Sequence, residues 1–222
     1  IIASLKIKLF KDGSYAEKIP FDHLFDKYGE NDVAISIGGD NYCYSSYEVY
    51  EILNKNFNKN GTKTVLWGCS VEPKLIDDKM AEDLGRYSLI TTRESISYEA
   101  VKKVNKNTKL IPDPAFQLEK IELPLPEGFE LNNTIGINMS PMIMSYETSD
   151  GSAMKNYENL IQHIIETTDM QIALIPHVVW VSNDDRKPLK VLYDKFKDTN
   201  RVIMLDDYNC MELKGFISRC RM

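Results

Sequence analysis

Short apolar runs alternate with longer amphipathic segments along most of the chain. Residues 33–37 (VAISI) form such a run, and it stops at two glycines, which predicts a buried strand followed by a turn. Similar runs predict further strands at residues 63–69, 88–92, 109–111, 134–138, 171–176 and 201–205. Apolar residues at helical spacing predict helices at residues 45–57, 74–86, 95–104, 155–167, 186–196 and 208–217. This alternation indicates parallel sheets with helical crossovers.

One polar stretch interrupts the alternation. Residues 119–133 contain Pro124, Pro126, Gly128 and paired asparagines among scattered glutamates, a composition typical of linkers. We therefore predict an α/β protein with two Rossmann-like, doubly wound parallel-sheet domains. Their predicted bounds are 1–122 for the N-terminal domain, 123–133 for the linker and 134–222 for the C-terminal domain. The chain begins without methionine and ends shortly after a predicted helix, so we expect both ends to be incomplete and the second domain to be truncated.

Composition and charge narrow the classes of function. Hydrophobic residues make up 43% and charged residues 27%, which are ordinary globular values. A net charge of -6 gives nucleic acid no general electrostatic attraction. No apolar stretch approaches the roughly 20 residues of a membrane-spanning helix, and no signal-peptide pattern is present, so we expect a cytoplasmic protein without a membrane span. The sequence leaves a homo-oligomer open.

The cysteines do not predict a metal site. The four of them are widely separated, with no C-x-x-C pair and no histidine at metal-ligand spacing. We expect reduced thiols and no bound metal.

Candidate chemistry gathers after the predicted strands. Ligands of open parallel sheets bind beyond the carboxyl ends of the strands. The residues that follow the strands are markedly polar: Gly38, Gly39, Asp40, Asn41, Tyr42, Gly68, Ser70, Arg93, Ser95, Asp113, Asn138 and His177, with Asp184 and Asp185 just beyond.

Arg93 and His177 carry the clearest alternatives. Arg93 can make bidentate contacts to a phosphate or carboxylate, with Ser95 and the helix N-terminus binding the same anion. Equally, Ser95 can be an N-cap, and Arg93 can pair with a carboxylate of the protein.

His177 can be a general acid or base, or it can contact a sugar hydroxyl or a phosphate. The structural alternative is that His177 is a hydrogen-bonded histidine and that Asp184 or Asp185 caps the next helix.

The glycine pair after the first strand matches no nucleotide-binding motif. Neither the dinucleotide fingerprint G-x-G-x-x-G nor the P-loop G-x-x-x-x-G-K-[ST] occurs there. The sequence therefore argues against a nicotinamide enzyme and against a P-loop NTPase.

The ordered set of motifs resembles a known family. I-S-I-G-G-D-N-Y, L-W-G-C-S-V-E-P, T-T-R-E-S, I-P-D-P-A-F and I-G-I-N-M-S occur in the order seen in polysaccharide pyruvyl transferases. The resemblance implies a GT-B-like pair of Rossmann-type domains with the active site in the cleft between them. It also implies transfer of a pyruvyl group from phosphoenolpyruvate to a pair of sugar hydroxyls, forming a ketal on a cell-surface glycan or its lipid-linked precursor. No cofactor besides the donor substrate is implied.

The resemblance assigns residues one by one. Gly38, Gly39 and Asp40 match the first strand-end motif, Trp67-Gly68 the second, Arg93 and Ser95 the arginine–serine motif and Asp113 the acidic turn. His177, Asp184 and Asp185 resemble the loop of the second domain. The family's glycine-rich loop is expected before Ile1, and its Gly-x-Arg-x-His motif after Met222.

These matches define our candidate site. His177 and Asp40 are the catalytic candidates near the acceptor, and the general acid is left unassigned. The substrate-binding candidates are Gly38, Gly39, Asn41, Tyr42, Trp67, Gly68, Ser70, Arg93, Ser95, Asp113, Asn138, Asp184 and Asp185. Two alternatives remain: a GT-B-type glycosyltransferase that uses a nucleotide-sugar, and a non-catalytic module that binds a glycan or a protein partner.

Overall fold

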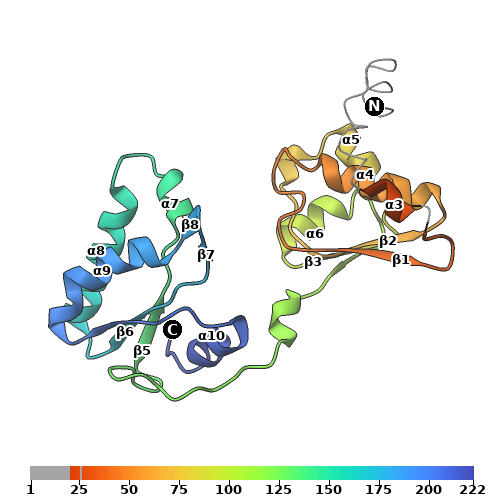
Figure 1. Cartoon of the computed structure of the whole chain (residues 1–222). Coiled ribbons are helices and arrows are strands. Elements are labelled where there is room, and N and C mark those ends of the chain that lie inside the picture. Colours follow the sequence, from red (N-terminus) through yellow and green to blue (C-terminus); the bar gives the residue numbers. More distant parts are fainter. Residues whose placement is uncertain (1–20, 26) are drawn as a thin grey trace. The chain divides into compact units, whose positions relative to one another are not determined.

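The computed structural model describes residues 21–25 and 27–222 (Figure 1). The part of the predicted N-terminal domain before Phe21 lies outside these residues. Contacts divide the chain into two compact units, Ile1–Gln117 and Leu118–Met222. Each unit combines helices with a parallel sheet, so the predicted α/β class is confirmed.

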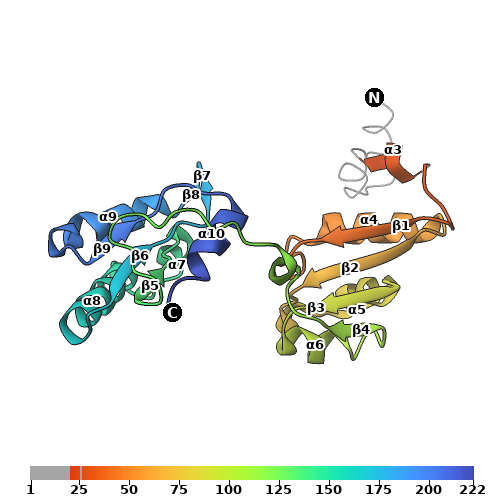
Figure 2. The same ribbon diagram turned by 90° about the horizontal axis from the view of Figure 1, so that it is seen from below.

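The first unit contains a four-stranded parallel sheet with the strand order β1-β2-β3-β4 (Figure 2). The strands and helices that form it are α3 (Asp22–Phe25), β1 (Val33–Ile37), α4 (Glu48–Lys59), β2 (Lys63–Cys69), α5 (Asp78–Arg86), β3 (Leu89–Thr92), α6 (Ser95–Val101) and β4 (Thr108–Leu110), with short 3-10 turns at Pro73–Leu75 and Pro114–Gln117. Neighbouring strands follow one another in sequence, so all four carboxyl ends lie along one edge.

Apolar side chains bury one face of this sheet. Leu66 and Ile90 pair across β2 and β3, and both pack against Met80 and Leu84 of α5. The opposite face is more open, since Ile37 of β1 is 77% exposed. The helices of the described part of this unit therefore cover one face of the sheet, whereas a doubly wound sheet has helices on both.

A buried polar network holds α5 against the segment after β1. Tyr42 is fully buried, and its hydroxyl donates to Asp83 Oδ2 at 2.6 Å and lies 2.9 Å from the hydroxyl of Tyr87. The Asn54 side chain donates to Asp83 Oδ1 at 2.9 Å. Burial raises the pKa of Asp83, and its carboxylate is stabilised by the hydrogen bonds from Tyr42 and Asn54 and by the Arg86 guanidinium, which donates to Asp83 Oδ1 at 3.0 Å. Tyr42, predicted from sequence to bind substrate, is part of the core.

We expect Tyr42→Phe to destabilise the protein by about 2 kcal/mol, because it removes a donor from a buried carboxylate. Urea unfolding monitored by circular dichroism measures this loss. Tyr28→Phe is the matched control, since Tyr28 is 46% exposed. Equal unfolding midpoints for the two variants would contradict the role of the network.

The second unit contains a three-stranded parallel sheet with the order β5-β6-β9 and a separate hairpin, β7-β8. Its strands and helices are β5 (Thr134–Ile137), α7 (Pro141–Ser145), α8 (Ser152–Thr167), β6 (Gln171–Leu174), β7 (Val179–Trp180), β8 (Asn183–Asp184), α9 (Arg186–Phe196), β9 (Val202–Met204) and α10 (Cys210–Ile217), with a 3-10 turn at Lys197–Thr199.

Both faces of this second sheet are covered (Figure 1). Ile172 and Leu174 of β6 pack with α8 and α9, whereas Ala173 and Ile175 pack with α10. This alternation along one strand is the arrangement that a buried parallel strand requires. The second unit is therefore Rossmann-like in its layers.

Residues 123–133, predicted to be a linker, lie within the second unit. Leu123, Leu125 and Phe129 join the core beside α10. The Ile121 N–H donates to the Met211 carbonyl at 3.0 Å, and a Cβ on Gly215 would lie only 1.9 Å from the Ile121 carbonyl oxygen. The prolines of this segment favour an extended backbone, while its leucines supply the apolar surface that binds it to the helix.

Every helix in the described part of the chain is too short or too polar to cross a lipid bilayer.

Candidate active site

Four strand ends of the first unit meet at one guanidinium. Arg93 follows β3, and its Nε donates to Ser70 Oγ, after β2, at 2.8 Å. Its Nη1 donates to Asp113 Oδ2, after β4, at 3.0 Å. Its Nη2 donates to Asp40 Oδ1, after β1, at 2.5 Å. We call Asp40, Ser70, Arg93 and Asp113 the Arg93 cluster; the parallel sheet places all four at the same edge, as the sequence predicted.

Gly39 allows the guanidinium to approach the backbone. A Cβ at position 39 would lie 2.3 Å from Arg93 Nη1, far inside van der Waals contact. The Gly39 carbonyl also accepts the Ser70 N–H at 2.6 Å, which fixes the turn after β1 against the end of β2. Glycine at this position is therefore a requirement of the Arg93 cluster.

We expect Gly39→Ala to displace Arg93 from its partners while lowering the stability by only about 1 kcal/mol, because a flexible side chain can move away. The change is measurable in a structure of the variant and by its thermal unfolding. Gly29→Ala is the matched control, since its Cβ would have no neighbour closer than 3.7 Å. An unmoved Arg93 in Gly39→Ala would show that the close approach is not required.

The charges of the Arg93 cluster do not cancel. One guanidinium faces the carboxylates of Asp40 and Asp113, which leaves the group with one excess negative charge. The Ala115 N–H, together with Arg93, lowers the pKa of Asp113, so that carboxylate is firmly ionised. Asp40 is the more exposed partner of Arg93, at 52% against 32% for Asp113. An anionic ligand that binds Arg93 would therefore displace Asp40 more readily than Asp113.

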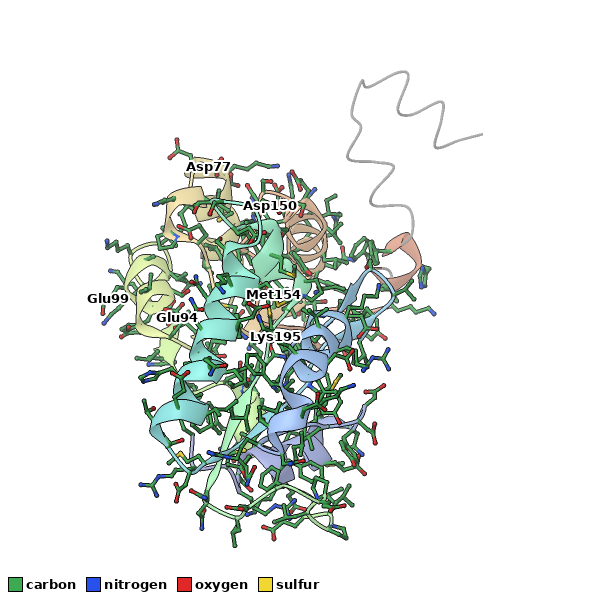
Figure 3. All side chains as sticks on the ribbon, turned by 90° about the vertical axis from the view of Figure 1, so that its left-hand side faces the viewer. Asp77, Glu94, Glu99, Asp150, Met154 and Lys195 are labelled. Carbon is green, nitrogen blue, oxygen red and sulfur yellow. The ribbon has the colours of Figure 1, made fainter. Side chains whose placement is uncertain are left out.

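The N-terminus of α6 is occupied by the protein's own carboxylate. Glu94 accepts the Ile96 N–H at 2.7 Å and the Ser97 N–H at 3.0 Å, and it lies at the start of α6 in Figure 3, with Glu99 further along the helix. Glu94 is thus the N-cap, whereas the sequence predicted Ser95 for this role or for an anion contact. Ser95 is exposed at the first position of α6.

The other predicted site residues of the first unit have partners outside the Arg93 cluster. Asn41 donates through its amide to Ser36 Oγ of β1 at 3.1 Å, after Gly38 has turned the chain with a φ of 135°. Gly68 has a φ of 69°, and a Cβ there would lie 2.8 Å from Pro114. Trp67 is 41% exposed and pairs with Ile37, whose side chain is on the open face of the sheet. These residues adjoin the Arg93 cluster without contributing a polar contact to it.

Asp185 organises the strand ends of the second unit. Its Oδ2 accepts the Asn138 amide at 2.9 Å, the His177 N–H at 3.0 Å and the Val178 N–H at 2.9 Å. Asp185 is 1% exposed; burial alone would raise the pKa of its carboxyl, but these hydrogen bonds hold the pKa below its ordinary value. We call Asn138, His177 and Asp185 the Asp185 cluster. A carboxylate this buried holds the turn after β6 in place through the N–H groups of His177 and Val178, and its contact to substrate stays a prediction.

His177 lies on the surface, and Asp184 faces a different partner. Asp184 accepts two hydrogen bonds from the Arg186 guanidinium, at 2.9 and 2.8 Å. The contact between His177 and Asp185 is made by the backbone N–H, and His177, which is exposed, lines a cavity of about 160 Å³ together with Asn138. Of the predicted capping alternatives, Asp185 is at the N-cap position of α9 without a side-chain cap bond, whereas Asp184 Oδ1 accepts the Arg186 N–H at 3.1 Å.

No metal centre is found in the described ranges. Among residues 21–25 and 27–222, no three His, Cys, Asp or Glu side chains gather closely enough to hold an ion.

Comparison with protein families identifies the chain. A family model described as polysaccharide pyruvyl transferase matches residues 2–222. The chain belongs to this family. The resemblance inferred from the strand-end motifs is thereby confirmed. No protein of curated function matches the chain significantly.

In this member of the polysaccharide pyruvyl transferase family, the Arg93 cluster and the Asp185 cluster contain seven of the fifteen predicted site residues. The sequence reasoning missed the capping role of Glu94 and the structural role of Asp185. A glutamate directly before a serine-rich helix start was the available signal for the first. The role of Asp185 had no local signal in the sequence, because the partners of its carboxylate lie 7 to 47 residues away.

Proposed function

We propose that the protein is an enzyme that transfers a pyruvyl group from phosphoenolpyruvate to two hydroxyls of a saccharide. The Arg93 cluster, in a chain of this family, is the observation that carries the proposal. It provides a positioned guanidinium at the strand ends of a parallel sheet, where ligands of such sheets bind. Arginine matches the planar geometry of carboxylate and phosphate.

The reaction defines what the residues must do. The methylene carbon of phosphoenolpyruvate takes up a proton and becomes a methyl group. One sugar hydroxyl adds to the central carbon, and the second hydroxyl displaces phosphate, which closes the ketal. Of the two hydroxyl protons, one balances the proton taken up by the carbon and the other leaves with phosphate. The chemistry therefore needs an acid, a base and a cation for the donor.

We assign the cation to Arg93. When the donor binds, its phosphate or carboxylate displaces Asp40 from Nη2, while Asp113 and Ser70 keep the guanidinium in place. Asp40 is then free to accept a proton from an acceptor hydroxyl. This exchange removes the charge conflict between the donor and the resting Arg93 cluster.

The second unit supplies the other polar groups. His177 and Asn138, held by Asp185, are the contacts to the substrates that we propose for this unit; a GT-B-like pair of domains stays a prediction of the family resemblance. Gly38, Gly39, Asn41, Trp67, Gly68, Ser95 and Asp184 remain predicted substrate contacts.

Turnover of two donors tests the proposal. The full chain is incubated with phosphoenolpyruvate, and separately with nucleotide-sugars, each with and without neutral oligosaccharides. Release of phosphate from phosphoenolpyruvate that depends on an oligosaccharide, together with a mass gain of 70 Da on the saccharide for the added pyruvyl group, is the expected result. Nucleotide release instead would indicate a glycosyltransferase. Turnover of neither would indicate a binding module and contradict the proposal.

A further inference from the structure

A second hollow of the second unit lies apart from both clusters. It has a volume of about 440 Å³ and is formed by α7, the beginning of α8 and the loop between them, which carries Asp150 (Figure 3). Its lining consists of Ile143, Tyr146, Glu147, Thr148, Ser152, Ala153, Asn156 and Tyr157. The volume falls within the range of small-molecule sites, about 300–1,000 Å³. We call it the α7–α8 pocket.

The charge of this pocket excludes an anionic ligand. No Arg, Lys or His is among the lining residues, and the single ionisable acid, Glu147, is negative. Glu147 accepts the Ala153 N–H at 2.8 Å and the Gly151 N–H at 3.0 Å, and these hydrogen bonds lower the pKa of its carboxyl. The N-terminus of α8 is thus already neutralised from within. Phosphoenolpyruvate and nucleotides do not fit these electrostatics.

Aromatic rings and neutral polar groups remain to bind a ligand. Tyr146 is 74% exposed, whereas Tyr157 is partly buried against the core, so one ring is free and the other is anchored. Asn156 and Thr148, both exposed, add an amide and a hydroxyl. Rings beside hydrogen-bonding side chains suit a neutral ligand with apolar faces and a polar rim, which describes a sugar ring.

The pocket is connected to the Asp185 cluster by a short segment. α7 begins after Ser140, which lies two residues after Asn138. The Ser140 side chain caps this helix by accepting the Met142 N–H. α7 also packs against β8, which carries Asp184. A saccharide held in the pocket would therefore lie on the same strand-end side of the unit as Asn138.

We propose that the α7–α8 pocket binds a neutral sugar residue of the acceptor glycan. The assignment of this sugar to the acceptor rests on the proposed function; the binding itself does not. Tyr146 stacks on the sugar ring, and Asn156 hydrogen-bonds to its hydroxyls.

Binding is tested on the full chain by titration calorimetry. The probes are neutral trisaccharides of glucose, galactose, mannose and N-acetylglucosamine. At least one should bind, and Tyr146→Ala should weaken it about tenfold or more, which corresponds to about 1.4 kcal/mol. Tyr146→Phe should retain binding because the ring does the stacking, and Asn156→Ala should weaken it severalfold. Asn159→Ala is the matched control, since Asn159 is an exposed α8 residue outside the lining.

The outcomes separate this inference from the proposed function. Binding that depends on Tyr146, without turnover of phosphoenolpyruvate, would support the pocket and contradict the enzyme. Turnover with an unchanged acceptor KM in Tyr146→Ala would support the enzyme and overturn the pocket. Failure of every trisaccharide to bind at millimolar concentration would also overturn it.

Discussion

Replacing Arg93 by alanine is expected to lower kcat/KM for phosphoenolpyruvate by about a hundredfold or more. The variant removes the guanidinium that the proposed function assigns to the donor, and loss of one positioned donor to a developing charge costs about 10²–10³ in rate. Arg93→Lys should recover only part of the loss, because a compact ammonium group lacks the three separate nitrogens with which the planar guanidinium binds Ser70, Asp40 and Asp113. Steady-state assays of phosphate release measure both variants.

The control must separate catalysis from folding. The side chains of Arg93, Asp40 and Asp113 are 28%, 52% and 32% exposed, so both ion pairs of Arg93 are screened by water and each contributes at most about 1 kcal/mol to stability. Thermal unfolding of Arg93→Ala should therefore stay close to wild type. Lys102→Ala, which removes an exposed cation of the same unit whose ammonium group contacts Tyr98, should leave the kinetics unchanged. An unaltered kcat/KM in Arg93→Ala would remove Arg93 from the site.

Asp185→Ala is expected to lower the free energy of unfolding by about 3 kcal/mol. It leaves the partly buried amide of Asn138 and the N–H groups of His177 and Val178 without their shared acceptor. Guanidinium unfolding measures the loss. Asp198→Ala, at an exposed aspartate of the same unit, should change stability by less than about 0.5 kcal/mol. Similar effects for the two variants would contradict the positioning role of Asp185.

The same carboxylate gives a pH dependence of defined sign. Its pKa in the folded protein lies below the unfolded value, which is about 3.9. Its contribution to stability is therefore complete above the unfolded pKa and is lost as the pH falls through the folded pKa. The stability difference between wild type and Asp185→Asn should shrink over that acidic range. A difference that grows on acidification would show that the carboxylate is not stabilised in the folded state.

Strands of both sheets could be predicted from the sequence, because a short apolar run bounded by glycine or proline is a local signal. The strand predicted at residues 33–37 and the helix predicted at residues 186–196 have the observed bounds. The hairpin β7-β8 was not predicted, since its two-residue strands are too short for any periodicity. The segment 123–133 was predicted as a linker from its content of proline, glycine, asparagine and glutamate, and this composition does not reveal that Leu123, Leu125 and Phe129 pack beside α10.

The sequence predicted which residues of the candidate site lie close together only where the order and direction of the strands determine it. The rule that ligands lie at carboxyl strand ends brought Asp40, Ser70, Arg93 and Asp113 together correctly. The same rule cannot tell which way a side chain turns after the strand. Tyr42, only two residues beyond Asp40, enters the core because Asp83 and Tyr87 are there to receive its hydroxyl.

The way the Arg93 cluster is assembled affects when it can form during folding. Its partners lie 20, 23 and 53 residues from Arg93, so none of these contacts is local. Closing such loops in the unfolded chain has an entropic cost that three partly exposed contacts cannot offset. The cluster therefore forms only once the four parallel strands are in register. Displacement of any one of these strands would therefore break at least one contact of the Arg93 cluster.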